Sequence, residues 1–194
     1  MGSHMLNQEK RFKIMSGKKS KDKGKSFERE VCKFLSERYS GSFQRVFDSG
    51  AFTGGSNQIR RQTLSEGQIR NQKGDIIPPD GWKYFNCECK SYSDFPFHQL
   101  FFKMRIVLLE SWIQQLMNAS DTGDCNIIIM KFNRKGKYVM INKNEPFCYN
   151  KYVEYVDENQ NCWVFMEFEN FFNLNHHLFS KRCQNMKIRQ LPLG

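Results

Sequence analysis

Two short apolar runs, joined by a Pro-Pro-Asp-Gly turn, carry charges that restrict the fold more than any other feature. Asp75 opens the first run, and the second ends in the tripeptide Glu88-Cys89-Lys90. Side chains on a β-strand alternate between faces, so Glu88 and Lys90 share a face and the Cys89 carbonyl lies between them. A simple hairpin would place Asp75 opposite Asn86, one same-face step from Glu88. The pattern therefore predicts paired strands that bring two carboxylates and an amine together.

This combination of groups can support metal chemistry on a phosphodiester. Hard cations such as Mg²⁺ take oxygen ligands and keep several waters, so Asp75, Glu88 and the Cys89 carbonyl can hold Mg²⁺, with Mn²⁺ as a substitute. The ion lowers the pKa of a bound water, and Lys90 can position that water or stabilise developing negative charge. Glu88-Cys89-Lys90 is the only Asp/Glu-x-Lys tripeptide in the chain. The alternative is an ion pair on an edge strand that faces water.

The formal net charge of +10 is concentrated in two segments. Residues 6–25 hold eight Lys and Arg against two acidic residues, and residues 50–74 hold four against one. The rest of the chain is close to neutral. Concentrated positive charge indicates a polyanion partner, and DNA is the partner we expect. The alternative is a solvated basic arm that only aids solubility.

Length and composition indicate the broad class of protein. The 194 residues are enough for one domain with a core. Seven cysteines without a Cys-x-x-Cys pair argue against a disulfide framework and a zinc knuckle, so we expect reduced thiols. Reduced thiols indicate an intracellular location: the cytoplasm, the nucleoid, an organelle, or a host cell if the protein is viral. No apolar run approaches the roughly 20 residues of a membrane helix, so no membrane partner is expected.

The chain divides into a basic arm, one folded domain and a short tail. Residues 1–25 begin with Met-Gly-Ser-His-Met, typical of an expression-tag remnant, and continue as a basic arm that we expect to be disordered. Residues 26–180 form the expected domain, and residues 181–194 form a basic tail. A long basic loop insertion occupies 50–74. Loops of this length tend to be functional or disordered, so it is the best candidate for a DNA-contacting element.

Hydrophobic periodicity predicts alternating helices and strands. Apolar residues recur with helical spacing over 26–39 and 97–118, and alternation or short apolar runs indicate strands elsewhere. The leading order is α-β-β-β-α-β, which predicts an α/β domain with a central mixed sheet flanked by helices. The predicted strands are 42–49, 75–77, 84–90, 126–132, 138–141, 152–156 and 162–166, with a short helix over 167–174.

The motif Gly-Asp-Ile-Ile, followed by Asn-Cys-Glu-Cys-Lys-Ser, resembles the core of the PD-(D/E)xK nuclease superfamily. The run from Lys23 to Val31 resembles the first helix of archaeal-type Holliday junction resolvases, in which Lys-Gly precedes a helix whose Glu joins the metal site. A strand ending in Ser-Gly, then the Asp, then Glu-x-Lys follow in the same order here. The match covers about residues 23–92, and it implies a restriction-endonuclease-like core.

The resemblance implies roles for individual residues. Glu28, Asp75 and Glu88 would be the metal-site carboxylates, and Lys90 the catalytic lysine. Glu30 is an alternative to Glu28, but two positions turn a helix by about 200°, so both cannot face one ion. The position of Glu28 after Lys-Gly favours Glu28.

Further residues are candidates for substrate contacts. Ser49 matches a serine near the resolvase active site. Arginines of the basic loop can hold phosphates bidentately, although a solvated loop is the alternative. The candidate nucleic-acid-binding residues are Lys23, Lys25, Arg60, Arg61, Arg70 and Lys73.

We expect a Mg²⁺-dependent, structure-selective DNA endonuclease that acts on branched DNA as a Holliday junction resolvase. The superfamily resemblance implies 5′-phosphate and 3′-hydroxyl products. A resolvase needs two active sites, so a symmetric homodimer is expected. The sequence leaves open a restriction-like or replication/repair nuclease acting on duplex, flap or single-stranded DNA. It also leaves open a non-catalytic DNA-binding module of the same fold, or a structural core domain with a basic tail.

Overall fold

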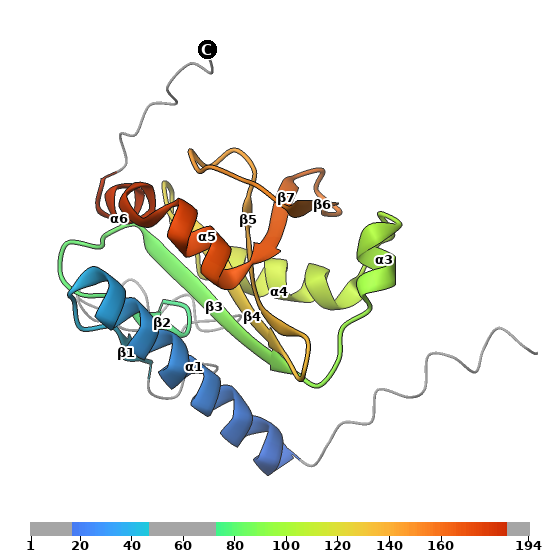
Figure 1. Ribbon diagram of the computed structural model, residues 1–194, viewed down its shortest axis with the longest axis horizontal. Coiled ribbons are helices and arrows are strands. Elements are labelled where there is room, and N and C mark those ends of the chain that lie inside the picture. Colours follow the sequence, from blue (N-terminus) through green and yellow to red (C-terminus); the bar gives the residue numbers. More distant parts are fainter. Residues whose placement is uncertain (1–16, 47–72, 186–194) are drawn as a thin grey trace, which may run out of the picture.

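A five-stranded mixed sheet forms the centre of the computed structural model, which describes residues 17–46 and 73–185 (Figure 1). The first two strands in the sheet run parallel, and the remaining neighbours are antiparallel. The predicted central mixed sheet is therefore confirmed. The strand order is β3 (Phe85–Tyr92), β4 (Cys125–Phe132), β5 (Gly136–Asn142), β7 (Cys162–Glu167) and β6 (Tyr152–Val156).

Helices cover both faces of this sheet, as the α/β prediction requires. Successive residues of β4 alternate between two cores, with Ile127 buried on one face and Ile128 on the other. Strands buried on both faces read as continuous apolar runs, which is why β4 was recognisable in the sequence. The helices on the Ile127 face are α1 (Gly17–Tyr39), α5 (Phe168–Leu174) and α6 (His176–Gln184), and those on the Ile128 face are α3 (Phe97–Phe101) and α4 (Val107–Asn118).

A second, two-stranded sheet lies beside β3 and corrects the predicted hairpin. β2 (Ile76–Ile77) pairs antiparallel with β1 (Gln44–Arg45), not with β3. The predicted pairing of Asp75 with Asn86 is wrong, because the Asp75 amide donates to the Cys87 carbonyl at 2.8 Å. The two prolines after β2 explain the difference, since proline lacks the N–H that a continuing β2–β3 ladder would need.

The prediction of a single helix over 97–118 is also wrong, because the helix is interrupted between α3 and α4. Lys103 adopts a left-handed conformation (φ 53°), and Ile106 is extended (φ −116°, ψ 100°). Six residues turn a continuous helix by about 240°, so one helix could not direct both Leu100 and Ile106 into the same core. The break lets both side chains be buried and leaves Phe101 largely exposed.

Both ends of the domain extend beyond the predicted boundaries. α1 begins at Gly17, inside the segment predicted to be disordered, and α6 continues to Gln184, past the predicted boundary at residue 180. Cys183 is fully buried in the core beneath α1, so packing holds the last turn of α6 in place. Local composition did not reveal these contacts.

Part of the prediction falls outside the described residues. The basic loop is described only from Lys73, the strand predicted over 42–49 only through residue 46, and the basic tail only through residue 185. Within residues 17–46 and 73–185, no helix has the length and apolar character needed to cross a membrane.

Candidate active site

Asp75 lies at the edge of β3 and is fastened there by both its backbone and its side chain. Its amide donates to the Cys87 carbonyl at 2.8 Å, and its Oδ2 accepts from the Cys89 amide at 2.8 Å. Its carbonyl accepts from the Val46 amide at 3.0 Å, which ties the same residue to the β1 segment. The buried carboxylate is therefore held against the strand that carries Glu88.

The residue before Asp75 has to be glycine for this close approach. Gly74 has a φ of 62°, a conformation that costs side-chain-bearing residues free energy. A Cβ at this position would lie 2.4 Å from the carbonyl oxygen of Cys87. The Gly-Asp dipeptide thus acts as one unit, in which the glycine permits the contact that positions the carboxylate.

Glu88 and Lys90 project together from β3 toward α4, as the alternation predicts. Glu88 is 3% exposed, and its Oε2 accepts a hydrogen bond from Lys90 Nζ at 2.8 Å. The same amine donates to Gln115 Oε1 on α4, also at 2.8 Å. Two hydrogen bonds therefore hold the lysine beside the carboxylate.

Glu28 approaches from α1, on the opposite face of the sheet. Its side chain is mostly buried, and its Oε2 lies 3.4 Å from Nη1 of Arg45 on β1. Because Asp75 occupies the strand edge, it stands between the face that carries Glu28 and the face that carries Glu88. The three acidic residues that the resemblance implied therefore gather around one edge of β3.

The charge of Asp75 acts on both of the other carboxylates. Burial, followed by the charge of Asp75, raises the pKa of Glu88 to about 7, although the Lys90 amine opposes this. Burial and the Asp75 charge also raise the pKa of Glu28, while Arg45 opposes. Because buried like charges repel, a bound cation would stabilise this group.

The oxygen atoms of the three carboxylates are of the type that a hard divalent cation binds, although their present positions do not form a metal site. Among residues 17–46 and 73–185, no group of three or more His, Cys, Asp or Glu side chains is placed to hold a metal ion. Each carboxylate has at least one oxygen engaged: Asp75 with the Cys89 amide, Glu88 with Lys90, and Glu28 with Arg45. A side-chain hydrogen bond with Asp75 also helps raise the pKa of Glu88. A carboxylate has two oxygens, so an ion can be held through the others. The use of the Cys89 carbonyl as a ligand stays a prediction.

Glu30, the alternative on α1, points elsewhere. Its two carboxylate oxygens lie 2.6 Å from Lys131 Nζ and 3.4 Å from Lys137 Nζ. The charge of Asp75 acts on Glu28, and the choice of Glu28 over Glu30 as a metal-site residue stays a prediction.

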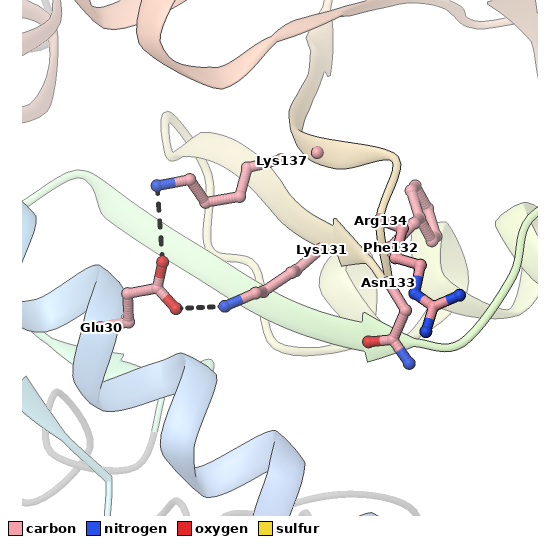
Figure 2. Close-up of a pocket in the computed structure, with 7 residues that line it drawn as sticks. Glu30, Lys131, Phe132, Asn133, Arg134 and Lys137 are labelled. Atoms are coloured by element: carbon pink, nitrogen blue, oxygen red, sulfur yellow. Dashed lines mark hydrogen bonds and ion pairs between the residues drawn. The ribbon is translucent and has the colours of Figure 1, made fainter.

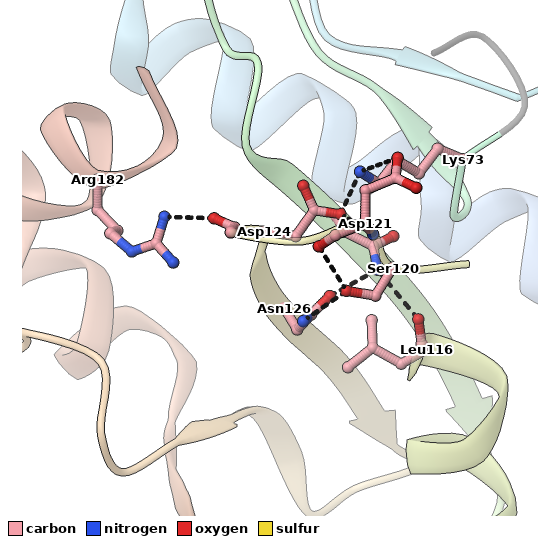
Figure 3. A network of polar contacts seen from close by, with 9 residues as sticks. Lys73, Leu116, Ser120, Asp121, Asp124, Asn126 and Arg182 are labelled. Atoms are coloured by element: carbon pink, nitrogen blue, oxygen red, sulfur yellow. Dashed lines mark hydrogen bonds and ion pairs between the residues drawn. The ribbon is translucent and has the colours of Figure 1, made fainter. Parts of the chain in front are cut away.

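Lys73 does not have the exposed position expected of a phosphate-binding residue. Its side chain is buried and forms ion pairs with Asp121, at 3.0 Å, and with Asp124 (Figure 3). Figure 3 also shows Arg182 donating to the loop that carries these acids, through the Gly123 carbonyl at 3.0 Å. The amine of Lys73 therefore anchors the chain just before Gly74 and is already neutralised.

The other predicted DNA contacts divide between the described and the undescribed parts of the chain. Lys23 and Lys25 are exposed on α1, and the charge of Lys25 is felt by Glu28. The positions that lie outside the described residues are Ser49, Arg60, Arg61 and Arg70.

Two residues that contact the site were missed in the sequence. Arg45 pairs with Glu28, and Gln115 orients Lys90. The alternation over 42–49 predicts that Arg45 lies on one face of a strand, but it does not show which residue packs against that face. No local signal distinguishes Gln115 from Gln114, because only the packing of α4 on β3 selects one of them.

An acidic residue docked on a strand that carries Glu-x-Lys is the arrangement for which the PD-(D/E)xK nucleases are named, and it places this protein in that class. Sequence comparison identifies the family: a group described as phage putative PDDEXK endonuclease matches residues 19–181, and the chain belongs to it. The matched range includes Glu28, Asp75, Glu88 and Lys90. The predicted membership of the superfamily is therefore confirmed. A search of curated proteins found no match.

Among solved structures, similarity extends to Archaeoglobus fulgidus Hjc, a Holliday junction resolvase from an archaeal hyperthermophile. The two chains are 14% identical, and the alignment covers 76% of this chain and 91% of that one, with a TM-score of 0.32. At this level of similarity, neither substrate nor assembly carries over.

Proposed function

We propose that this protein is a Mg²⁺-dependent endonuclease that cleaves branched DNA as a Holliday junction resolvase. The observation that carries the proposal is the docking of Asp75 on β3. There its charge acts on both Glu28 and Glu88, and Lys90 lies beside Glu88. The net charge of +10 supports a DNA substrate, because neutralising phosphates is the main source of affinity for DNA.

In this proposal, the carboxylates of Glu28, Asp75 and Glu88, with the Cys89 carbonyl, hold the ion. Mg²⁺, or Mn²⁺ in its place, would supply a bound water of lowered pKa and stabilise negative charge on the phosphate. The buried setting strengthens these interactions, because the effective dielectric constant there is lower than in water.

Lys90 would act directly on the reacting groups. Its amine can orient the attacking water or stabilise charge that develops on the phosphate. The bonds to Glu88 and Gln115 restrict the lysine before substrate arrives, so little conformational entropy remains to be lost. Ser49 stays a predicted participant.

Cleavage of a four-way junction and of a matched linear duplex, each in Mg²⁺, Mn²⁺ and EDTA, tests the proposal. The wild type should cut the junction only with metal, and Glu88→Ala should lower the rate at least about 1,000-fold while DNA binding survives. Glu154→Ala is the matched control, since Glu154 also pairs with a lysine but lies on β6 at the far edge of the sheet.

Each outcome of this assay discriminates between functions. Equal cleavage by wild type and Glu88→Ala would rule out the site. Equal cleavage of duplex and junction would favour the restriction-like or repair nuclease, and metal-independent binding without cleavage would favour a DNA-binding module.

The proposal extends to assembly and location. Resolving a junction needs two active sites, so we propose a symmetric homodimer. The exposed aromatic pair Phe101 and Phe102, 66% and 76% exposed beside the α3–α4 break, is the candidate contact surface. The phage family description supports a location within a host cell, one of those expected from the sequence.

A further inference from the structure

A hollow of about 440 Å³ opens between α1 and the β4–β5 hairpin (Figure 2). Three cationic side chains, Lys131, Arg134 and Lys137, line it with a single acidic residue, Glu30. The remaining lining residues are Phe132, Asn133 and Gly136. Glu169 also lies 3.9 Å from Lys137 Nζ, so three positive groups face two negative ones, a balance that still favours an anionic ligand.

The two lysines of this hollow are pre-positioned. Figure 2 shows both amines reaching the carboxylate of Glu30, at 2.6 Å from Lys131 and 3.4 Å from Lys137. Aromatic rings lie beneath them, with Lys131 Nζ 5.6 Å from the centre of the Phe27 ring and Lys137 Nζ 4.9 Å from that of Phe168. The lysine side chains nevertheless remain 40% and 27% exposed, so a ligand can reach them.

Arg134 adds a cation at the tip of the hairpin. It is exposed, and among the described residues it makes no hydrogen bond or ion pair. Its φ of 60° is a left-handed conformation, which residues other than glycine adopt only uncommonly. The exposed guanidinium is available to a phosphate, which it can bind bidentately.

The hollow lies next to the candidate active site. In the β3–β4 ladder, Lys131 pairs with Ser91, the residue after Lys90, and neighbouring strands lie about 5 Å apart. Glu30 lies two residues after Glu28 on α1; the side chain of Glu30 faces the hollow, while Glu28 is within reach of the charge of Asp75. In Figure 1, the start of α1, the end of β3 and the β4–β5 turn all lie at one end of the molecule. A DNA strand that enters the active site can therefore pass over the hollow.

We propose that this hollow binds a backbone phosphate of the DNA substrate, within a few nucleotides of the bond that is cut. Lys131, Lys137 and Arg134 contact the phosphate, and Glu30 holds the two amines together in the free protein and competes with the phosphate for them. This inference rests on the proposed nuclease function and adds a substrate-positioning site to it.

Equilibrium DNA binding in EDTA, where cleavage is suppressed, tests this site with the full chain. The double variant Lys131→Gln/Lys137→Gln should bind junction DNA about tenfold more weakly near 0.1 M salt, and the slope of log K against log salt should fall by about 1 to 2. Glu30→Gln should bind several-fold more tightly, because the competing charge is gone. A merely structural Glu30 would not give tighter binding.

Matched controls come from the Lys143–Glu154 pair, which lies beyond the opposite end of β5. Lys143→Gln removes one positive charge, half of what the double variant removes, and Glu154→Gln removes one negative charge, as Glu30→Gln does. Both changes lie about 20 Å away, and both variants should bind like wild type to within about twofold. Exposed ion pairs contribute no more than about 1 kcal/mol to stability, so all the variants should fold, and thermal unfolding verifies this.

The outcomes separate the two proposals. Failure of the wild type to bind any DNA would contradict the nuclease function itself. Wild-type binding with no difference between the double variant and Lys143→Gln would overturn the phosphate site alone. Duplexes with and without 5′-terminal phosphates should bind with equal affinity. A higher affinity that requires the terminal phosphate and is lost in the double variant would mean that the hollow binds a DNA end and not a backbone phosphate.

Discussion

At the scale of single residues, the candidate site depends on how Asp75 is attached. Its side chain accepts a hydrogen bond from the Cys89 amide, so the residue stabilises the fold as well as belonging to the candidate site. Replacing it removes a partner from a buried amide, a loss worth about 1–3 kcal/mol, apart from any effect on catalysis. Loss of activity in an Asp75 variant therefore has to be interpreted together with its stability.

Glu88 should make the metal-free protein less stable as the pH rises. Its pKa of about 7 lies above the value of about 4.3 expected in an unfolded chain, so between these values the folded state keeps a proton that the unfolded state has released. This contribution to stability is complete below the unfolded pKa and is lost as the pH rises through 7. We expect Tm, measured in EDTA, to fall by roughly 5 °C between pH 5 and 8 through this group.

Glu88→Gln removes the titrating group, so the same pH series should show a smaller fall in Tm. Glu158→Gln changes an exposed glutamate and should follow the wild type. If Tm depended on pH in Glu88→Gln as it does in the wild type, the carboxyl group of Glu88 would not have the raised pKa. Adding Mg²⁺ at pH 8 should restore stability in the wild type more than in Glu88→Gln, because the ion removes the repulsion with Asp75.

At the scale of elements, the site depends on docking the short segment before β2 onto the edge of β3. β1 and β2 have two residues each, and such a small sheet is not stable by itself. The hydrogen bonds from Asp75 attach it to the larger sheet. The same contacts occupy part of the β3 edge, which otherwise would present unpaired backbone groups.

Gly74→Ala should disrupt this docking, because its Cβ would meet the Cys87 carbonyl and its φ is left-handed. Gly81→Ala is the matched control: Gly81 also has a positive φ, 92°, but an added Cβ there meets nothing within 4 Å. Chemical denaturation should show a loss of about 1–2 kcal/mol for Gly81→Ala and a clearly larger loss for Gly74→Ala. Similar losses in the two variants would mean that β3 yields easily to the added methyl group.

At the scale of the whole molecule, the two faces of the sheet carry different candidate functional residues. The face under α1, α5 and α6 carries Glu28 and the basic hollow, while the face under α3 and α4 carries Glu88 and Lys90. The edge of β3 is where groups from both faces can meet. The α3–α4 break adds exposed aromatic side chains away from that edge.

The homodimer proposal predicts that sedimentation will show a dimer of the 23.1 kDa chain at micromolar concentration. The double variant Phe101→Ser/Phe102→Ser should shift the protein toward monomer, because it removes two large apolar side chains that are exposed in the described part of the chain. Leu174→Ser, which changes an exposed apolar residue on α5, should leave the assembly unchanged. A wild-type protein that sediments as a monomer at all concentrations would contradict the proposal.

Local patterns account for what could be predicted from the sequence. The alternation of β3 places Glu88 and Lys90 on one face whatever surrounds the strand, and the apolar run of β4 marks a buried strand. The order of Glu28, Asp75, Glu88 and Lys90 was enough to indicate the nuclease class, because motif order survives changes in the loops between the residues.

Only the tertiary structure decided which groups meet across long stretches of chain. The bond between Lys131 and Glu30 joins residues 101 positions apart, and the burial of Lys73 depends on acids that lie 48 or more positions away. Such contacts are set by the packing of whole elements, which one-dimensional periodicity does not encode. The sequence by itself therefore determined the chemical groups and the faces they occupy, while packing determined the partners and geometry of each group.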